Sequence, residues 1–323
     1  MNELHKKPVL AFVVDAFPVV SEPFIIEQVA GLLDRGFDVR IVAFKRGVTH
    51  GISDKFTSYS MAGRTVYIDV PKDIVTRAIR AVPRAFSLVR KDPRGLLNAI
   101  NIFRYGRDAL SLNLLYWADA FAGQTFELAH CHFGSIGNKF VRIKNVLRLP
   151  QKFITTFYGY DISRAFKQYG PRLYDDLKGE CSLFFVMSEN ARKRVIAYGF
   201  DADKVVVHPI GINVNDYPFR ERMAPDNRPV GIISVGRLVE KKGFDDLVKA
   251  LAIARGKTSK PFRCTIVGDG PMKHHITEMV RSLHLDPLVD FKGSMKIEDI
   301  IPLLSKMDFF VQPSKTAADG NME

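Results

Sequence analysis

The sequence predicts two successive α/β domains, each built on a parallel sheet that helices cover on both faces. Its 323 residues are about twice the ~150 residues of an average domain. Short apolar, β-branched runs alternate with stretches of helical spacing along most of the chain, which is the pattern of a doubly wound sheet. A polar, proline-containing segment, residues 217–229, interrupts this alternation once and has the composition of a linker. We therefore expect an N-terminal domain over residues 1–215 and a C-terminal domain over residues 216–323.

The first domain opens with a β-α-β unit. Residues 9–14 form a continuous apolar run, residues 22–34 have helical spacing before Gly36, and residues 38–44 form a second run. The order then recurs: strands are expected over residues 126–131, 152–157, 183–187 and 204–207, with helices ending near Leu147 and spanning residues 161–168 and 189–198. Residues 73–121 interrupt it with a long helical region, which we expect Pro83 and Pro93 to divide.

The second domain repeats the alternation. Strands over residues 230–235, 262–267, 289–292 and 308–312 are expected to alternate with helices over residues 244–254, 271–283 and 297–304. Pro271 is placed at the start of its helix, where a proline is tolerated. The 108 residues from Asp216 to Glu323 fall short of the ~150 of a complete domain, so this domain is predicted to be truncated.

The composition excludes several classes of protein. With 46% apolar and 25% charged residues, the chain is expected to be globular and folded. No apolar run reaches the ~18–20 residues that cross a bilayer, and the amino terminus does not resemble a secretory signal. Three cysteines, Cys131, Cys181 and Cys264, lie beside strand-like sequence and indicate buried thiols in a reducing compartment. We expect a cytoplasmic protein, at most peripheral on the inner face of the cell membrane.

The formal net charge of +12 favours anionic partners. Half of this excess falls in residues 72–108, which hold nine basic and three acidic residues. The same segment contains an apolar group formed by Leu96, Leu97, Ile100, Ile102 and Phe103. An amphipathic helix on an anionic membrane surface would have this composition, and so would a solvated helical face. No nucleic-acid partner is expected, because no recognition motif is present and the basic segment has few stacking aromatics.

Two turns of the second domain could bind phosphate groups. The segment from Gly236 to Gly243 follows a strand and precedes a helix, so Arg237 and Lys242 lie where the helix amino terminus and two cations could clamp a pyrophosphate. A solvated turn is the alternative. The turn Gly268-Asp-Gly270-Pro271 is either a phosphate loop or a tight turn, and Lys273 at the third glycine position excludes the dinucleotide fingerprint.

The first domain has polar residues at the ends of two expected strands. His130 and His132 are two residues apart and therefore share one face of their strand, where they could bond a substrate or simply end a buried strand. No third ligand lies at a useful spacing, so no metal site is expected. Asp161 is placed to cap the next helix, while Tyr158 and the glycine after it can shape a pocket. Hydrolase and kinase motifs do not occur.

Taken together, six segments resemble the retaining GT4-like glycosyltransferases, which have the GT-B architecture of two facing Rossmann-like domains. The segments occur in the family's order and cover nearly the whole chain: residues 17–25, 130–134, 156–161, 235–243, 267–271 and 312–323. The first and last of them are most similar to bacterial exopolysaccharide enzymes of the colanic-acid type. The resemblance therefore implies a GT-B fold with an incomplete second domain.

The resemblance also implies roles for individual residues. Arg237 and Lys242 match the pair that holds the donor diphosphate, and His132, with His130 beside it, matches the histidine near the reacting carbon. Glu323 matches the first glutamate of the family's E-x7-E motif, so His132 and Glu323 are the implied catalytic residues. The implied donor and acceptor cleft contains Ser21, Glu22, His130, Tyr158, Asp161, Gly236, Gly268, Gly270 and Gly293. Tyr158 replaces a histidine common in related sequences, and the second glutamate would fall eight residues beyond Glu323.

The implied reaction is transfer of a sugar from a UDP-, GDP- or ADP-sugar to a carbohydrate or lipid-linked acceptor, with retention at the anomeric carbon. No cofactor or metal ion is expected, because cations and helix amino termini stabilise the charge on the leaving diphosphate. The alternative is a catalytically inactive, truncated fragment of such an enzyme. On the first interpretation the protein acts in the synthesis of a cell-surface polysaccharide.

Overall fold

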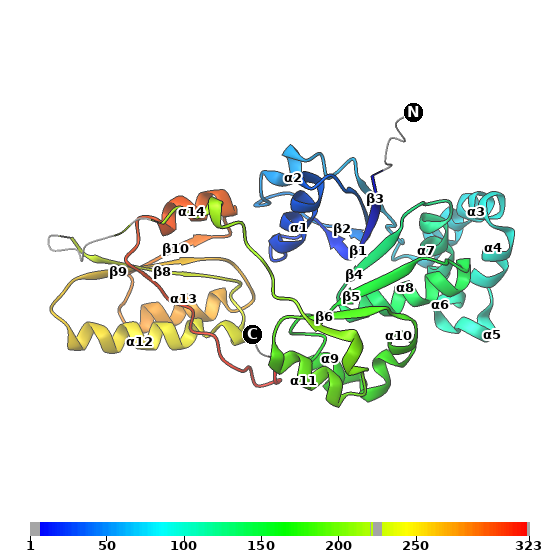
Figure 1. Ribbon diagram of the computed structural model, residues 1–323. Helices are drawn as coiled ribbons and strands as arrows, with labels where there is room; N and C mark the ends of the chain where they lie inside the picture. Colours follow the sequence, from blue (N-terminus) through cyan, green and yellow to red (C-terminus); the bar gives the residue numbers. More distant parts are fainter. Residues whose placement is uncertain (1–6, 220, 222–227, 322–323) are drawn as a thin grey trace. The chain divides into compact units, whose positions relative to one another are not determined.

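The computed structural model describes residues 7–219, 221 and 228–321. The chain divides into two compact units, which we describe separately (Figure 1). The first unit contains Met1–Thr49 and Lys55–Gly211, and the second contains His50–Asp54 and Ile212–Glu323. Glu323, to which the sequence analysis gives a catalytic role, lies outside the described residues.

The first unit is built on a seven-stranded parallel sheet with the order β3-β2-β1-β4-β5-β6-β7. The strands are β1 Val9–Phe17, β2 Asp38–Arg46, β3 Thr65–Tyr67, β4 Leu128–His132, β5 Lys152–Thr156, β6 Leu183–Val186 and β7 Val205–Val207. The central strands are continuous apolar runs because helices cover both of their faces. This is the Rossmann strand order, which reverses between β1 and β4.

Helices connect these strands. They are α1 Pro23–Asp34, α2 Lys55–Ser58, α3 Ile74–Lys91, α4 Pro93–Ala99, α5 Ile102–Tyr105, α6 Arg107–Leu110, α7 Asn113–Phe121, α8 Gly134–Leu147, α9 Arg164–Tyr169, α10 Asp175–Glu180 and α11 Glu189–Ala197. Leu88 of α3, Phe121 of α7 and Phe140 of α8 are fully buried and pack in one hydrophobic core with Phe153 of β5. The helical interruption between β3 and β4 is therefore part of the core of this unit.

The prediction that Pro83 divides the helical interruption was wrong, because α3 continues through it from Ile74 to Lys91. A proline in a helix interior costs roughly 3 kcal/mol. Here the inner face of the helix is anchored on both sides of the proline, by the buried side chains of Ala81 and Leu88. Pro93 begins a new helix, as predicted.

The second unit has a four-stranded parallel sheet with the order β10-β9-β8-β11. Its elements are β8 Val230–Val235, α12 Phe244–Lys257, β9 Phe262–Val267, α13 Lys273–Ser282, β10 Val289–Gly293, α14 Ile297–Leu304 and β11 Phe309–Phe310. Side chains of α12 and α13 pack on one face of the sheet, and side chains of α14 pack on the other. The helix predicted to start at Pro271 begins instead at Lys273, since Pro271 belongs to the preceding turn.

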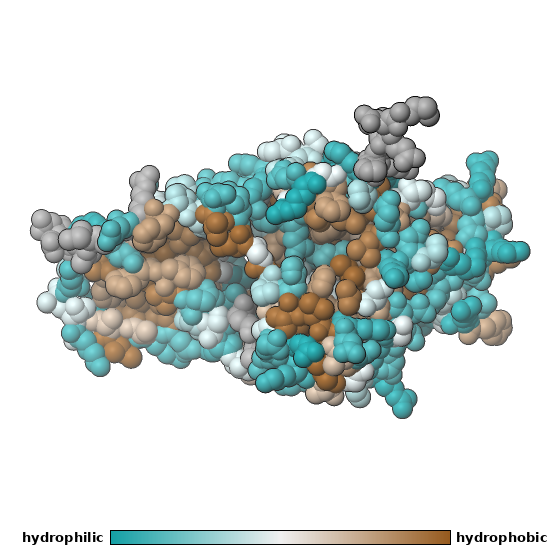
Figure 2. Space-filling model, in the orientation of Figure 1, coloured by the Kyte–Doolittle hydropathy of each residue, from teal (hydrophilic) through white to brown (hydrophobic). Residues whose placement is uncertain are grey.

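Part of the second unit is hydrophobic at its surface. In Figure 2 a hydrophobic area lies over the strands that Figure 1 labels β8, β9 and β10. On the edge strand β11, Phe309 and Phe310 are 61% and 55% exposed. Among the described residues, no helix combines the length and the apolar character needed to cross a lipid bilayer.

The three cysteines are buried, as their strand-like surroundings predict. Cys131 lies in β4, Cys181 precedes β6 and Cys264 lies in β9. Burial raises the pKa of the Cys181 and Cys264 thiols to about 12, and that of Cys131 well above its ordinary value. The thiols are therefore protonated at neutral pH.

Candidate active site

The first candidate region lies where the strand order of the first unit reverses. β1 ends at Phe17 and its neighbour β4 ends at His132. Ser21, which is exposed, and Glu22, which is partly buried, lie in the turn between β1 and α1. Ligands of open parallel sheets bind outside the carboxyl ends of the strands at such a reversal. The structure thus brings Ser21 and Glu22 to the same end of the sheet as His132.

His130 and His132 lie on one face of β4, as their spacing predicts. Their rings are stacked with centroids 4.2 Å apart, and both rings contact Phe12. His130 Nε2 shares a hydrogen bond of 2.7 Å with Thr156 Oγ1, and His132 Nδ1 shares one of 2.9 Å with the Tyr158 hydroxyl. We call these four residues, His130, His132, Thr156 and Tyr158, the histidine site.

The histidine site is electrically neutral. Desolvation lowers the pKa of His130 to about 4 and lowers the pKa of His132 well below its ordinary value. Desolvation also raises the pKa of the Tyr158 phenol, and the nearby Glu22 carboxylate adds to this effect. At neutral pH these groups can therefore exchange hydrogen bonds with a ligand without carrying charge.

One polar atom of the histidine site is unsatisfied. His132 is fully buried, and its Nε2 has no hydrogen-bond partner among the described residues. A buried polar atom without a partner costs about 1–3 kcal/mol, and in native proteins such atoms are uncommon. The aromatic side chains of Phe12 and Phe24 lie beside the ring. His132 therefore has a hydrogen-bonding capacity that the protein itself leaves unused.

Asp161 does not cap the helix that follows it, so that prediction was wrong. α9 begins at Arg164 with Ser163 at its N-cap position. The fully buried Asp161 carboxylate accepts hydrogen bonds from the backbone N–H of Gly134, 3.0 Å, from the backbone N–H of Tyr158, 3.1 Å, and from the Tyr174 hydroxyl, 3.4 Å. Gly134 is the first residue of α8, so Asp161 holds that helix start beside the backbone of Tyr158.

The environment of Asp161 opposes its ionisation. Desolvation raises its pKa to about 7, although the bonds from the Tyr158 and Gly134 N–H groups act in the other direction. The glycine at position 134 is sterically required, since a Cβ there would lie 2.3 Å from the Phe157 ring. Because its carboxyl group bonds both the start of α8 and the backbone of Tyr158, Asp161 is a positioning residue for the histidine site.

Sequence reasoning missed Thr156, Phe24 and Tyr174 as supports of this region. Thr156 pairs with His132 across β4 and β5, and this register is a tertiary contact that local sequence does not reveal. Phe24 packs on the Tyr158 ring at 4.8 Å between centroids, and Tyr174 donates to Asp161. Phe24 and Thr156 do lie within the motif segments, which was the one available signal.

The second candidate region lies at the carboxyl ends of the strands of the second unit. Backbone hydrogen bonds join the turns after three of them: Gly236 N donates to Val267 O at 2.9 Å, Leu238 N to Asp269 O at 2.9 Å, and Gly268 N to Gly293 O at 2.8 Å. We call residues 236–243, 268–272 and 293 the glycine loops. They bring together all four glycines that the sequence analysis places in the cleft: Gly236, Gly268, Gly270 and Gly293.

Close backbone packing explains the glycines. Gly268 has φ +139°, and a Cβ there would lie 1.9 Å from the carbonyl oxygen of Gly236. Gly243, at φ +68°, lies immediately before α12, and its Cβ would lie 1.9 Å from the carbonyl oxygen of Pro313. Since Pro313 follows β11, the turns after β8 and β11 also touch. β8 and β11 are the two strands between which the order of this sheet reverses.

Arg237 and Lys242 both lie in the turn after β8. The Arg237 side chain is exposed and forms no ion pair or hydrogen bond with another described residue. The Lys242 side chain runs alongside Gly236, with its Cδ 3.6 Å from the position of a Cβ there. α12 starts directly after this turn and directs unpaired N–H groups and partial positive charge toward it. The turn can therefore receive an anion.

Two carboxylates in the first turn of α12 do not cancel this charge. Lys315 Nζ pairs with Asp245 at 2.7 Å and with Asp246 at 2.8 Å, and Lys315 N donates to Lys241 O. Burial alone would raise the pKa of Asp245, but the hydrogen bond and charge of Lys315 outweigh it and hold that pKa below its ordinary value. Lys249 Nζ also lies 3.6 Å from Asp246, so two lysines offset the two carboxylates. Lys315 in addition ties the segment after β11 to the turn after β8.

No group of three or more histidine, cysteine, aspartate or glutamate side chains that could hold a metal ion occurs in the described part of the chain. The groups that the structure does place at the two regions are hydrogen-bonding side chains, cations and a helix amino terminus.

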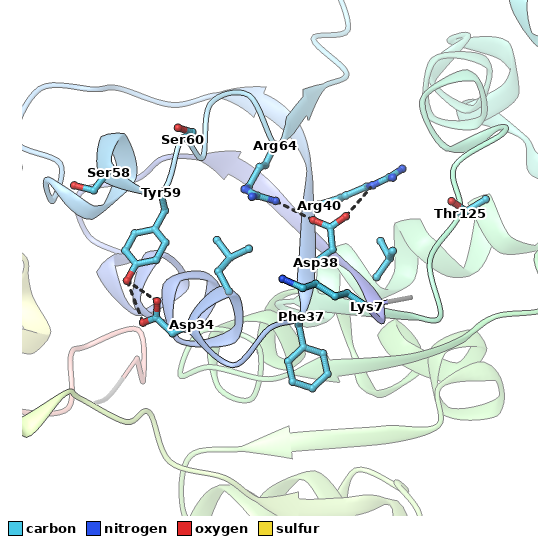
Figure 3. Close-up of a pocket in the computed structure, with 12 residues that line it drawn as sticks. Lys7, Asp34, Phe37, Asp38, Arg40, Ser58, Tyr59, Ser60, Arg64 and Thr125 are labelled. Carbon is cyan, nitrogen blue, oxygen red and sulfur yellow. Dashed lines mark hydrogen bonds and ion pairs between the residues drawn. The ribbon is translucent and has the colours of Figure 1, made fainter. Parts of the chain in front are cut away.

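A hollow of about 680 Å³ lies at the opposite end of the first sheet (Figure 3). Its lining includes Val9 and Asp38, the first residues of β1 and β2. Figure 3 shows the Tyr59 hydroxyl directed at Asp34, at 2.8 Å, and the Arg64 guanidinium directed at Asp38, at 2.8 Å. Because its charged groups pair with one another at the amino ends of the strands, this hollow is a weaker candidate than the histidine site.

Comparison with protein families assigns both units. Residues 21–216 match the family described as Glycosyltransferase Family 4, and residues 218–321 match the family described as Glycosyl transferases group 1. The first match alone covers more than half of the chain.

Individual relatives agree with this assignment. The amylovoran biosynthesis glycosyltransferase AmsK of Erwinia amylovora is 31% identical over 97% of this chain and 77% of its own length. WcaL of Escherichia coli K12, a glycosyltransferase assigned provisionally by its name to colanic acid biosynthesis, is 28% identical over 95% of this chain and 75% of its own. The Anabaena protein HepE, solved in complex with UDP and glucose, has a TM-score of 0.60 at 15% identity, covering 96% of this chain and 75% of its own.

The predicted fold class is confirmed, since each unit has a parallel, Rossmann-like sheet and the structural neighbours are GT-B glycosyltransferases. The likeness to exopolysaccharide glycosyltransferases, inferred from the motif segments, is also confirmed. The chain belongs to Glycosyltransferase Family 4.

Proposed function

We propose that this protein transfers a sugar from a UDP-sugar to a saccharide acceptor, with retention at the anomeric carbon. The observation that carries the proposal is the arrangement of Arg237, Lys242 and the amino terminus of α12 around the glycine loops, where the strand order of the second unit reverses. UDP-sugars are favoured as donors because the structural neighbour HepE was solved with UDP and glucose.

In the proposed reaction the glycine loops bind the donor diphosphate. Arg237 can bridge two phosphate oxygens through its planar guanidinium, and Lys242 acts as a point charge. Negative charge grows on the diphosphate as the bond to the sugar breaks. Cations and helix N–H groups that are already in place stabilise this charge without reorganising, which lowers the barrier without a metal ion.

The histidine site contacts the sugars in this proposal. His132 is neutral, buried and has a free Nε2, so it suits a hydrogen bond to a sugar hydroxyl rather than to a phosphate. Asp161 and Tyr158 hold its ring in place. The names of AmsK and WcaL place those relatives in exopolysaccharide synthesis, and we assign this protein to the same kind of process, with a free or lipid-carried saccharide as acceptor.

The first test measures donor binding by calorimetry with UDP, GDP and ADP. We expect UDP to bind most tightly. Arg237→Ala and Lys242→Ala should each weaken UDP binding about 10- to 100-fold, because a hydrogen bond to a charged group contributes about 1.5–3 kcal/mol. Lys257→Ala, which removes an exposed cation at the far end of α12, serves as the control and should bind UDP like the wild type. Unchanged affinity in both Arg237→Ala and Lys242→Ala overturns the diphosphate assignment.

The second test concerns the transfer itself. The protein is incubated with the UDP-sugar that binds best and with a panel of saccharide acceptors, and the configuration of the new linkage is read by NMR. A product with the anomeric configuration of the donor sugar agrees with the proposal. A product of inverted configuration contradicts the retaining mechanism, even if donor binding is as expected.

A further inference from the structure

The outer face of α3 carries a row of exposed apolar side chains. Val75, Ile79, Val82, Phe86 and Val89 are 62%, 67%, 54%, 61% and 37% exposed. Their spacing alternates between four and three residues, so all five lie along one side of the helix. We call these five residues the α3 stripe. Single exposed apolar residues are ordinary, but an aligned row of five on one helix marks an interaction surface.

The opposite face of α3 is fixed to the first unit, so the α3 stripe cannot simply turn inward. Ala81 and Leu88 are buried in the core. The Arg77 guanidinium donates to the carbonyl oxygens of Pro71, Lys72 and Ser111. The remaining inner cations, Arg84 and Lys91, both pair with Asp119 of α7.

The segment that contains α3 also carries unpaired cations. Six of the nine basic residues between positions 72 and 108 are exposed and form no ion pair with any residue that the structure describes: Lys72, Arg80, Arg90, Arg94, Arg104 and Arg107. Arg90 follows Phe86 by four residues and therefore borders the stripe directly. Arg104 only lies over the Tyr105 ring, at 5.4 Å.

The acidic residues of the segment are already engaged. Asp73 caps α3 through the Thr76 N–H, and Asp92 binds Arg148 through both of its oxygens. Asp108 pairs with Arg142. The segment contains no glutamate. The six cations are therefore uncompensated within it. Two of them, Arg80 and Arg90, lie on α3 itself, so the exposed surface of this helix is complementary to a negatively charged one.

The apolar group for which the sequence left open an amphipathic helix or a solvated helical face is divided in the structure. α4 ends at Ala99 and α5 begins at Ile102, and Leu96 packs against the core. The other members, Leu97, Ile100, Ile102 and Phe103, are 66%, 46%, 49% and 106% exposed. The amphipathic helix of this segment is α3 instead. Its signal was present in the sequence, but Pro83 concealed the continuity of the helix.

We propose that the first unit docks on an anionic lipid bilayer through α3, which lies flat in the interface. The α3 stripe enters the boundary between headgroups and acyl chains, while Arg80 and Arg90, the two unpaired cations of the same helix, contact lipid phosphates. A bilayer is favoured over an acidic protein partner because a long apolar row beside flexible arginines suits a fluid surface that is apolar below and anionic above. This inference does not depend on the proposed transferase activity.

The first experiment measures sedimentation of the full chain with vesicles. Vesicles of phosphatidylglycerol and phosphatidylcholine in equal parts are compared with vesicles of phosphatidylcholine alone. We expect binding to the anionic vesicles at about 20 mM salt and at least about tenfold weaker binding at about 300 mM, because salt screens the cations. Absence of binding to anionic vesicles at low salt overturns the proposal.

Paired variants separate the two contributions. Ile79→Ser with Phe86→Ser should reduce the partition coefficient about tenfold or more, since both side chains lose apolar contact. Arg80→Gln with Arg90→Gln should reduce it about 25-fold at low salt, from about fivefold for each cation. The matched controls lie on or next to α12 of the second unit: Ile253→Ser, at a side chain that is 59% exposed, and Lys257→Gln with Lys260→Gln. Equal losses in the controls overturn the assignment to α3.

A gain of signal tests the depth of insertion. Phe86→Trp places an indole in the α3 stripe, and we expect its emission to shift to the blue and to be quenched by lipids brominated on the acyl chain. Ile253→Trp should show neither change. A Phe86→Trp indole that stays exposed to water in the presence of vesicles overturns the proposal. The proposal is also overturned if the protein forms a concentration-dependent dimer that the Ile79→Ser and Phe86→Ser pair abolishes, because the α3 stripe would then contact a second copy of the chain. UDP binding, measured separately, is expected to be unchanged in all these variants.

Discussion

The histidine site and the glycine loops are held in place by opposite means. The histidine site is buried and neutral, and its geometry comes from side chains that bond one another and the Asp161 carboxylate. The glycine loops carry an exposed arginine, and their geometry comes from backbone atoms that bond one another. On the proposed function, the histidine site selects among neutral sugar hydroxyl groups, which buried hydrogen bonds of fixed geometry can do. The glycine loops would hold a diphosphate, which needs accessible positive charge and backbone N–H groups that the ligand can approach closely.

The difference predicts that the stability of the histidine site depends most on one buried group, the Asp161 carboxylate. Asp161→Ala leaves two backbone N–H groups and the Tyr174 hydroxyl without their acceptor. We expect the free energy of unfolding to fall by about 3–5 kcal/mol, because each buried unpaired group costs about 1–3 kcal/mol. Urea denaturation measures this. Asp161→Asn keeps one acceptor oxygen and should lose less, and a loss below about 1 kcal/mol in Asp161→Ala contradicts the positioning role.

The pH dependence of stability should separate the buried histidines from the buried carboxyl. Burial lowers the pKa of His130 to about 4, so the unfolded chain binds a proton below pH 6.5 that the folded chain does not. Stability present at pH 7 is therefore lost as the pH falls from about 6.5 toward 4, by up to about 3 kcal/mol. Burial raises the pKa of Asp161 to about 7, so the folded chain keeps a proton that the unfolded chain gives up at lower pH. This contribution to stability is complete at low pH and is lost as the pH rises from about 4 toward 7.

Asp161→Asn removes the second of these opposing effects. Between pH 4.5 and pH 7 the stability of this variant should consequently rise with pH more steeply than that of the wild type. Urea denaturation at several pH values gives both slopes. Equal slopes would show that Asp161 does not titrate in this range, and would break the distinction between the two kinds of buried group.

The glycine loops should be sensitive to added atoms rather than to lost hydrogen bonds. Gly268→Ala places a Cβ against the Gly236 carbonyl oxygen, so we expect a loss of about 2–3 kcal/mol and weaker UDP binding. Gly256→Ala, in the last turn of α12 with no atom within 4 Å of the new Cβ, should be neutral or stabilising by up to about 1 kcal/mol. Similar behaviour of the two variants, in thermal melts and calorimetry, would contradict the importance of close backbone packing.

The smallest expected effect tests the hydroxyl that orients His132. Tyr158→Phe keeps the aromatic packing but removes the partner of His132 Nδ1. We expect a loss of about 1 kcal/mol in the free energy of unfolding, since one net hydrogen bond is lost. If Tyr158 positions His132 for a sugar, the rate of transfer should fall more than this stability change explains. Tyr160→Phe, at a side chain that is 40% exposed, is the control.

Much of the fold could be predicted because strands buried on both faces appear in the sequence as apolar runs. β8 and β9 begin and end at the predicted residues, and the other predicted strands differ by a few residues. The short strand β3, Thr65–Tyr67, was not predicted. The shared face of His130 and His132 follows from the period of two in a strand. Contacts between distant segments could not be predicted in this way. The carboxylate of Asp161 accepts a hydrogen bond from the Gly134 N–H at the start of α8, 27 residues earlier in the chain, and does not cap the nearby α9.

The helical interruption shows the same limit. A proline is a local signal for a helix end, yet packing of α3 on both sides of Pro83 overrides it. The glycine loops were predicted only as separate turns. The backbone hydrogen bonds that join them, from Gly236 and Leu238 to the end of β9 and the turn after it, depend on the order of the strands in the sheet. Local rules thus located the turns, while the arrangement of the sheet determines which of them meet.

The burial of the three cysteines has a practical consequence for labelling. Cys131, Cys181 and Cys264 are buried, and their raised pKa values keep them as thiols, the form that reacts slowly with maleimides and other electrophiles. The native chain therefore provides a low background for thiol-directed probes. A single cysteine introduced on the surface, for example by Phe86→Cys or Ile253→Cys, can carry a fluorophore or spin label selectively, with every native cysteine left unchanged.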